Sequence, residues 1–170
     1  MKTDFTIRQA QQSDAVELKE LFQNTVLVIN RRDYSQAEVE DWASCGNNLS
    51  NIKERIETHC FVVAVNQQSQ IVGFSSITPQ GYLHSMFVHK DFQGEGIATM
   101  LLEEIERYAI TPGITRITSE VSLTARPFFE KKGYAVEKEQ KRKANQLSLT
   151  NFLMAKEVAF LEYYNKKVTD

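Results

Sequence analysis

The alternation of apolar and polar residues predicts a short strand at the start of the chain, followed by helices. Residues 4–8 alternate in polarity, as in a half-buried strand. Apolar side chains then recur at helical spacing over residues 14–29. Residues 35–44 begin with a Ser-x-x-Glu capping box, which predicts a second helix, and a further helical stretch covers residues 50–57.

The middle of the chain changes to the pattern of strands. Residues 61–65 are a continuous apolar run, which suits a strand buried on both faces. Residues 71–77 and 82–88 follow as two more strands, and we expect the three to form an antiparallel meander. After a loop, the apolar residues of 97–108 return to helical spacing.

The last third of the chain predicts a strand, a helix and two more strands. We expect a strand over 116–121, a short helix over 124–132, a strand that begins at 134–136 and a final strand over 147–155. The basic run 138–143 lies between the last two strands. We expect it to be a solvated loop, with an anion-binding edge as the alternative.

The order β-α-α-β-β-β-α-β-α-β-β predicts a single α/β (α+β) domain with a mixed, mostly antiparallel central sheet flanked by helices. Three consecutive strands between helical segments exclude the regular alternation of a Rossmann-type fold. We expect this domain over residues 1–156 and a surface helix in the C-terminal tail, residues 157–170.

Composition narrows the class of protein. The chain has 170 residues, a formal net charge of −2 and two cysteines, Cys45 and Cys60. The charge balance argues against a nucleic-acid partner, and no apolar run is long enough to span a membrane. The cysteines lack the spacing of a zinc site. We expect no metal, reduced thiols and a cytoplasmic monomer or homodimer.

Residues 88–98 join an apolar strand to an amphipathic helix and carry the most informative motif. Gly94 and Gly96 leave the backbone bare at this junction, and a helix N-terminus offers unpaired N–H groups with a partial positive charge. Together they suit a phosphate or pyrophosphate. Two glycines alone are also compatible with a plain turn. The Lys of a phosphate loop and the third glycine of a dinucleotide motif are missing.

The sequence Gln93-Gly94-Glu95-Gly96-Ile97-Ala98 resembles the Q/R-x-x-G-x-G/A signature of the GNAT superfamily of acetyl-CoA-dependent N-acetyltransferases. Residues 125–134, Ala-Arg-Pro-Phe-Phe-Glu-Lys-Lys-Gly-Tyr, are similar to the helix-to-strand segment of that family. The predicted element order agrees with the family, and the resemblance covers nearly the whole chain. Residues 34–43, 126–130 and 150–152 further resemble its bacterial YafP-like branch.

The resemblance implies acetyl-CoA as the cofactor. Its pyrophosphate would lie on the backbone of the glycine junction, and its pantetheine arm would pair with the strand before that junction. The implied cofactor-binding residues are Met86, Phe87, Val88, Gln93, Gly94, Glu95, Gly96, Ile97, Ala98, Thr99, Ser122, Phe128 and Phe129. The N–H of Phe87 or of a neighbour would polarise the thioester carbonyl. Tyr34 and Trp42 fall where the family shapes its acceptor pocket, although core packing also suits Trp42.

Two residues depart from the family pattern. Glu95 stands where a basic residue is common, and we expect its side chain to point to solvent, away from the anionic cofactor. Phe129 stands where many relatives carry a tyrosine that protonates the leaving thiolate. Tyr134 is the nearest substitute for that acid in the sequence.

The acceptor also needs a base, since an alkyl amine with a pKa of about 10.4 is only about 0.04% neutral at pH 7. His84 is one candidate, and strand alternation predicts it on the face of Met86 and Val88. Glu120, on the next strand and opposite in face to Ile117, is the other. The alternatives are a half-buried structural histidine and a surface or ion-paired carboxylate. An arylamine acceptor would need no base.

The resemblance therefore predicts an N-acetyltransferase that moves an acetyl group directly from acetyl-CoA to the amine of a small molecule. One alternative is an acyl-CoA-binding sensor without catalysis, which Phe129 favours. A second is acetylation of the amine of a protein or of an aminoacyl-tRNA. The net charge of −2 argues against the tRNA.

Overall fold

The structure, a computed structural model, describes residues 4–158. The strands are β1 (Thr6–Gln9), β2 (Cys60–Val65), β3 (Ile71–Ile77), β4 (Tyr82–Val88), β5 (Arg116–Ser122), β6 (Ala135–Lys143) and β7 (Ser148–Glu157). The helices are α1 (Ala15–Val28), α2 (Gln36–Ser44), α3 (Leu49–Thr58), α4 (Ile97–Ile110) and α5 (Arg126–Lys131). The short 3-10 helices are η1 (Gln12–Asp14), η2 (Asn30–Arg32) and η3 (Cys45–Asn47). The expected tail helix falls outside the described residues, except that Glu157 ends β7.

The seven strands form one mixed sheet in the order β1-β2-β3-β4-β5-β7-β6. Only the pair β4–β5 is parallel, and the other neighbours are antiparallel. The predicted fold class and the central meander are confirmed. Three α-helices, rather than the two of the predicted order, separate β1 from β2, because residues 50–57 form the core of α3.

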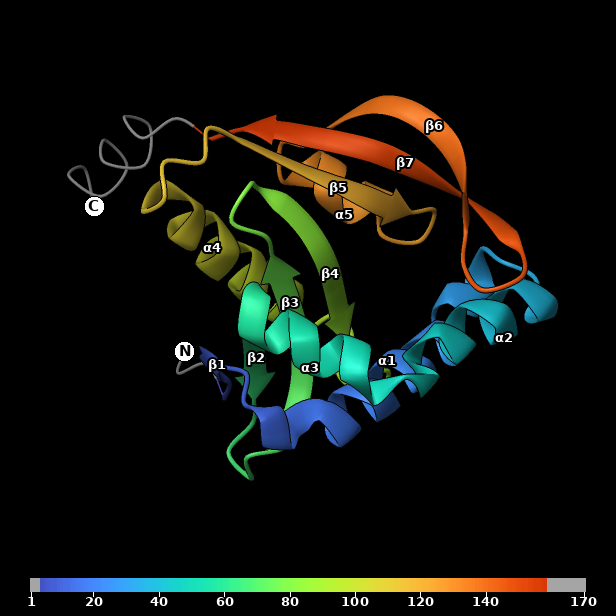
Figure 1. Cartoon of the computed structure of the whole chain (residues 1–170), viewed down its shortest axis with the longest axis horizontal. Coiled ribbons are helices and arrows are strands. Elements are labelled where there is room, and N and C mark those ends of the chain that lie inside the picture. Colours follow the sequence, from blue (N-terminus) through green and yellow to red (C-terminus); the bar gives the residue numbers. More distant parts are fainter. Residues whose placement is uncertain (1–3, 159–170) are drawn as a thin grey trace.

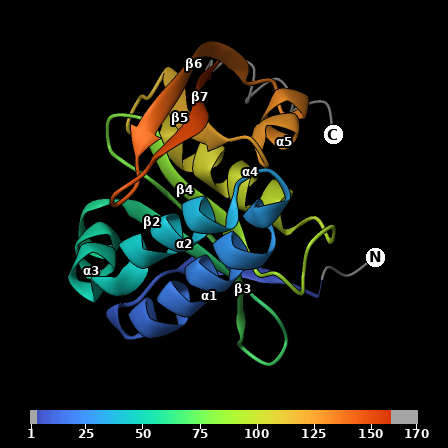
Figure 2. The same cartoon turned by 90° about the vertical axis from the view of Figure 1, so that its right-hand side faces the viewer.

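Helices cover both faces of the sheet, with α1 and α3 on one face and α4 on the other (Figures 1 and 2). This explains why β2 is apolar throughout. Val62 and Ala64 pack in the cluster with α4, whereas Val63 and Val65 pack in the cluster with α1. A strand with a helix on each side needs apolar residues at both sets of alternate positions.

The capping box predicted before α2 is present. The Oγ of Ser35 accepts a hydrogen bond from the N–H of Glu38 at 3.1 Å, and the carboxylate of Glu38 accepts one from the N–H of Ser35 at 2.9 Å. These bonds satisfy two backbone donors that the start of a helix leaves without an intrahelical partner. The same sequence signal therefore determines that α2 begins at Gln36, directly after its N-cap Ser35.

The basic run at 138–143 is a strand, which corrects the prediction of a solvated loop. β6 pairs with β7 along its whole length, and almost all of its residues are exposed at the edge of the sheet. Charged residues are common on such edges because they discourage pairing with another chain. Hydrophobic periodicity cannot mark this kind of strand, since neither of its faces is buried.

Within residues 4–158, no helix is long and apolar enough to cross a membrane. Cys45 and Cys60 are free thiols, as expected.

Candidate active site

Strands β4 and β5 meet at only two residue pairs and then diverge (Figure 1). The pairs are Tyr82 with Thr118 and Leu83 with Ser119. Beyond them, β4 continues to pair with β3 on its other side, and β5 continues to pair with β7. The β5-facing edge of residues 85–88 is therefore open for pairing with an extended, amide-bearing chain.

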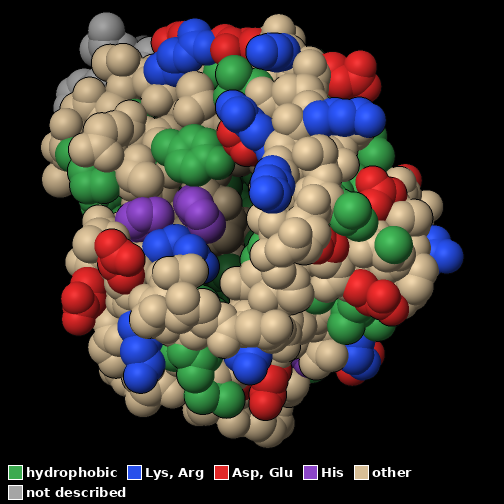
Figure 3. Space-filling view, turned by 45° about the vertical axis from the view of Figure 1, so that its right-hand side comes forward, with side chains coloured by type: hydrophobic (Ala, Val, Ile, Leu, Met, Phe, Trp, Pro, Cys, Tyr) green, Lys and Arg blue, Asp and Glu red, His purple; other side chains and the backbone are tan. Residues whose placement is uncertain are grey.

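A cleft of about 1150 Å³ opens where the two strands separate. Figure 3 shows this hollow, with histidine side chains beside it and Lys or Arg side chains around it. The predicted residues that line it are Tyr34, Trp42, His84, Met86, Phe87, Val88, Gln93, Gly94, Gly96, Ile97, Ala98, Thr99, Glu120, Ser122, Phe128 and Phe129. Glu95 and Tyr134 do not line it. The fold thus collects the predicted residues, apart from these two, around one space.

The glycine junction presents bare backbone at one end of this cleft. Gly94 and Gly96 have φ of +74° and +81°, and Gly96 is the N-cap of α4. A Cβ built on either glycine would meet no atom within 4 Å, so the space beside both is open. The first N–H groups of α4 are therefore accessible to an anion. Glu95 is exposed, in agreement with the expectation that its side chain points to solvent.

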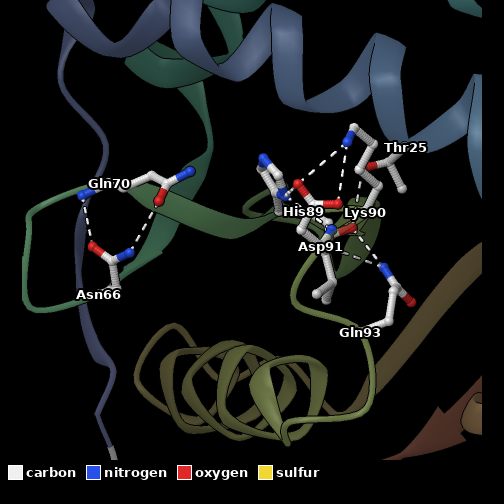
Figure 4. Close-up of polar contacts among 8 residues, drawn as sticks. Thr25, Asn66, Gln70, His89, Lys90, Asp91 and Gln93 are labelled. Carbon is white, nitrogen blue, oxygen red and sulfur yellow. Dashed lines mark hydrogen bonds and ion pairs between the residues drawn. The ribbon is translucent and has the colours of Figure 1, made fainter.

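Side-chain hydrogen bonds hold the loop before this junction (Figure 4). The Nε2 of Gln93 donates to the carbonyl of Val88 at 2.7 Å, and the Oγ1 of Thr25, from α1, donates to the same carbonyl at 3.0 Å. The Nδ1 of His89 accepts a hydrogen bond from the N–H of Asp91. The side chain of Gln93 thus positions the loop, and the backbone remains available for a ligand.

Aromatic side chains form one wall of the cleft. The Trp42 ring centroid lies 5.7 Å from that of Tyr34, 6.1 Å from Phe87 and 6.4 Å from Phe22. Trp42 is half-buried, so it both packs in the core under α2 and faces the cleft. The position of Trp42 is therefore compatible both with shaping the acceptor pocket and with packing in the core.

The hydroxyl of Tyr34 fastens two segments that are distant in sequence. It donates to the carbonyl of Thr150 at 2.6 Å and accepts a hydrogen bond from the N–H of Leu123 at 2.9 Å. Tyr34 is only 5% exposed, so both bonds are shielded from water. Burial raises the pKa of this hydroxyl, which therefore stays protonated at neutral pH. Tyr34 consequently positions β7 and the β5–α5 loop as well as lining the cleft.

His84 is the extra residue of a β-bulge, and the prediction of its face is wrong. Leu83 pairs with Ile77 and Ser85 with Ser76, so the side-chain alternation of β4 is interrupted between them. Met86 and Val88 consequently pack toward the cluster that contains α4. The ring of His84 instead lies 5.7 Å from that of His59, at the end of α3 on the opposite side of the sheet.

The environment of His84 disfavours its protonated form. The side chain is reached by solvent, yet the concave wall of the cleft displaces much of the water around it. This desolvation, reinforced by the positive charge of Arg55 and by His59, lowers the pKa of His84 to about 4. His84 is therefore neutral at pH 7 and can accept a hydrogen bond.

Glu120 lies on the opposite wall and is ion-paired. Its Oε1 is 3.0 Å from the Nε of Arg142, which belongs to the basic run of β6. The face predicted for Glu120 is confirmed, because Ile117 is fully buried in the core whereas Glu120 lines the cleft. Burial, together with the negative charge of Glu120, raises the pKa of Tyr82 to about 12. The cleft therefore places a carboxylate, a neutral imidazole and a protonated phenol around one space.

Tyr134, the predicted substitute acid, is outside the cleft. It is 3% exposed, and its hydroxyl donates to the carboxylate of Glu106 at 3.1 Å. Burial and the nearby charge of Glu106 raise its pKa. Its ring packs edge-on against Phe129, which does line the cleft. The structure thus places Phe129 in the lining of the cleft and keeps Tyr134 in the core behind it.

Several cleft residues carried no signal in the sequence. Arg55 and Tyr82 line the cleft, and His59 contacts His84. Arg142 also lines it, but belongs to the basic run 138–143, for which an anion-binding edge was the alternative to a loop. In the sequence Arg55 is one charged residue of an amphipathic helix, where charge usually means exposure to solvent. Only the packing of α3 beside the diverging strands turns Arg55 toward the cleft.

Comparison with known proteins assigns this geometry to a family. Residues 30–157 match the family model described as acetyltransferase (GNAT) domain. The chain is 29% identical over 149 residues to the uncharacterized N-acetyltransferase YafP of Escherichia coli (strain K12), covering 87% of this chain and 93% of that protein.

Solved structures have the same fold. A GCN5-related N-acetyltransferase from Rhodopseudomonas palustris superposes with a TM-score of 0.86 at 26% identity, covering 89% of this chain and 94% of the other. The PaiA N-acetyltransferase from Thermoplasma acidophilum, solved in complex with coenzyme A, superposes with a TM-score of 0.74 at 19% identity, covering 90% and 98%. At that identity the second likeness supports the fold alone.

Proposed function

The chain belongs to the GNAT acetyltransferase family, and from this we propose that it transfers the acetyl group of acetyl-CoA to the amine of a small molecule. Acetyltransferase activity and the use of acetyl-CoA follow from the family. The small acceptor is inferred from the cleft, whose volume of about 1150 Å³ suits the arm of the cofactor beside a metabolite-sized molecule.

One observation carries the proposal: the open edge of β4 leads directly to the glycine junction, within the same cleft. The N–H groups of Gly94, Gly96 and the first turn of α4 would hold the pyrophosphate. Residues 86–88 would pair with the pantetheine amides, and Ser122 would contact the same arm. Phe128 and Phe129 would pack at the thiol end. These residues fit the cofactor because they combine bare N–H groups with an unpaired strand edge.

Acetyl-CoA supplies the acetyl group as an activated thioester. The acceptor nitrogen bonds to the acetyl carbon as the carbon–sulfur bond breaks, and the amine releases one proton. Glu120 and His84 both line the cleft and can accept that proton. His84, with a pKa of about 4, is a weak base toward an alkyl amine of pKa about 10.4. We assign the proton to Glu120, directly or through water, because protonation of a carboxylate creates no new charge, whereas protonation of His84 would add a positive charge near Arg55. His84 keeps a hydrogen-bonding role.

Neither wall supplies a tyrosine acid in the predicted place. Phe129 cannot donate a proton, and the hydroxyl of Tyr134 is bound to Glu106 in the core. We infer that coenzyme A leaves as a thiolate and takes its proton from solvent. The N–H of His89 donates to Val72 on β3, so strand alternation turns the N–H of Phe87 toward β3 as well and that of its neighbour Val88 toward the open edge. We assign the N–H of Val88 as the donor to the carbonyl oxygen during transfer.

The test measures thiol release from acetyl-CoA with a panel of alkyl amines, arylamines, amino acids, polyamines, lysine peptides and aminoacyl-tRNA. We expect release above the amine-free background with at least one small amine, together with the N-acetylated product by mass spectrometry. Release only with lysine peptides or aminoacyl-tRNA would overturn the small-molecule acceptor while leaving the acetyltransferase. Tight acetyl-CoA binding without release with any amine would favour an acyl-CoA sensor.

A further inference from the structure

An arginine that has no polar partner among residues 4–158 lines the cleft. Arg55, on α3, is half-buried, and its guanidinium makes no hydrogen bond or ion pair with the residues that the structure describes. Burial lowers its pKa, and the neighbouring Glu54, which is exposed, acts on it only through space. A partly desolvated guanidinium is costly unless something binds it. Carboxylates and phosphates bind it best, through two parallel N–H donors.

The cleft as a whole is positive, although the chain is negative. Its lining contains three cations, Arg55, Arg142 and Lys143, and one anion, Glu120, which gives 3 − 1 = +2. The whole chain carries −2. Because Arg142 is paired with Glu120, Arg55 and Lys143 supply the excess. Such a cleft attracts anions and repels polycations.

The charge of Arg55 lies at the end of the cleft away from the glycine junction. Arg55 acts on the pKa of His84, which places the two near each other. His84 precedes the last residue of β4, Val88, by four positions, which is roughly 13 Å along a strand. The glycine junction begins after Val88, so Arg55 lies well away from the predicted pyrophosphate site. Asn48 and Asn51, from the N-terminal end of α3, also line the cleft and add amide groups.

We propose that the acceptor is an amine that also carries a carboxylate, as an amino acid does, and that Arg55 binds this carboxylate. The inference rests on the proposed function, because it names the substrate class of the same cleft. Arg55 acts as a specificity determinant: it orients the acceptor so that the amine lies between His84 and Glu120. Polyamines are excluded by the same charge.

The test compares amines that differ only in one charge. Each amino acid is paired with its α-amide, which lacks the carboxylate. Phosphoethanolamine reports on phosphate, and spermidine on polycations. We expect the carboxylated members to have the higher kcat/KM. Arg55→Gln should lower kcat/KM for these by about 10- to 100-fold, mainly through KM, as expected for loss of a charge-assisted hydrogen bond. Arg55→Lys should recover part of it.

Two controls separate this inference from the proposed function. Calorimetric binding of the same amines to the coenzyme A complex gives a readout that needs no turnover. Arg32→Gln, an exposed arginine outside the cleft, controls for the loss of a positive charge. Coenzyme A should bind Arg55→Gln and the unmodified chain with equal affinity.

Three results would overturn the inference. Arg55→Gln could lower kcat/KM equally for the amino acids and for their α-amides. The chain could prefer spermidine or phosphoethanolamine as the acceptor, or it could bind no carboxylated amine. Carboxylated amines that bind through Arg55 without being acetylated would instead reject the proposed function alone.

Discussion

The Nε of Arg142 lies 3.0 Å from the Oε1 of Glu120, although β7 separates the strands that carry them. The ion pair therefore spans three strands and brings the tip of the β6–β7 hairpin over the cleft. The carboxylate of Asp41, on α2, accepts hydrogen bonds from the backbone N–H groups of residues 145–147 and fixes the same tip from the other side. Glu120 is thus held in a defined place on the wall of the cleft.

Glu120→Gln should lower kcat by about 100-fold or more, since a positioned base contributes about 10²–10⁴. The amide keeps the size of the side chain and removes its ability to accept a proton. Arg142→Gln is the matched control: it breaks the same partly exposed ion pair, worth about 1 kcal/mol at most, and should change kcat by less than about fivefold. Steady-state kinetics with an accepted alkyl amine test both. If both substitutions lowered kcat equally, the loss would come from breaking the ion pair and not from removing a base.

Gly96→Val should abolish coenzyme A binding while the chain stays folded. The φ of +81° strains any residue with a Cβ, and the added side chain would project beside the first N–H groups of α4. Gly113→Val is the control, because Gly113 has φ of +76° and equally open space but does not line the cleft. Each variant should lose about 1–2 kcal/mol of stability. Calorimetry with coenzyme A should show a loss for the first alone; unchanged affinity would reject the phosphate assignment.

The sequence alone was sufficient to predict those parts of the structure that a local sequence signal determines. The apolar run 61–65 could only be a strand between two helix layers, and the Ser35 capping box determined the start of α2. The bare backbone at Gly94 and Gly96 was readable for the same reason, because a glycine pair before an amphipathic helix exposes N–H groups whatever surrounds it.

Features that depend on distant packing were not predictable. The face of His84 was wrong because a one-residue bulge in β4 interrupts the alternation, and no residue type announces that bulge. β6 was mistaken for a loop because an exposed edge strand has no apolar face. Arg55 became a cleft residue only through the placement of α3 beside β4, which the spacing of apolar residues does not encode.

Tyr34→Phe should destabilise the fold by about 1–3 kcal/mol. The change removes the hydrogen bond to the Thr150 carbonyl and leaves the N–H of Leu123 without its partner in a buried setting. Tyr108→Phe is the control, since the Tyr108 hydroxyl makes no hydrogen bond within the described residues, and it should cost less than about 0.5 kcal/mol. Urea unfolding measures both. An equal, small cost would show that Tyr34 does not fasten the β5–α5 loop.

Tyr134→Phe should leave kcat unchanged and lower stability by about 1 kcal/mol. The hydroxyl lies in the core, and Glu106 keeps Lys156 as a partner at 3.1 Å after the change. Steady-state kinetics measure kcat of this variant, and urea unfolding measures its stability. A fall in kcat of tenfold or more at unchanged stability would make Tyr134 the acid for the leaving thiolate.

His84 should make the fold less stable as the pH falls from about 6.5 to about 4. Its pKa is lowered from 6.5 to about 4 in the folded chain, so between these values the unfolded chain binds a proton that the folded chain does not. Above this window the ring is neutral in both states and has no effect. Desolvation also lowers the pKa of His59, which acts in the same direction. The midpoint of urea unfolding should therefore fall with pH less steeply in His84→Gln, and least steeply when His59→Gln is added. An identical pH dependence in all three chains would contradict the low pKa. The low pKa would also be contradicted if kcat fell with decreasing pH around a midpoint near 6.5 and His84→Gln removed that midpoint. Such a result would make His84 the base in place of Glu120.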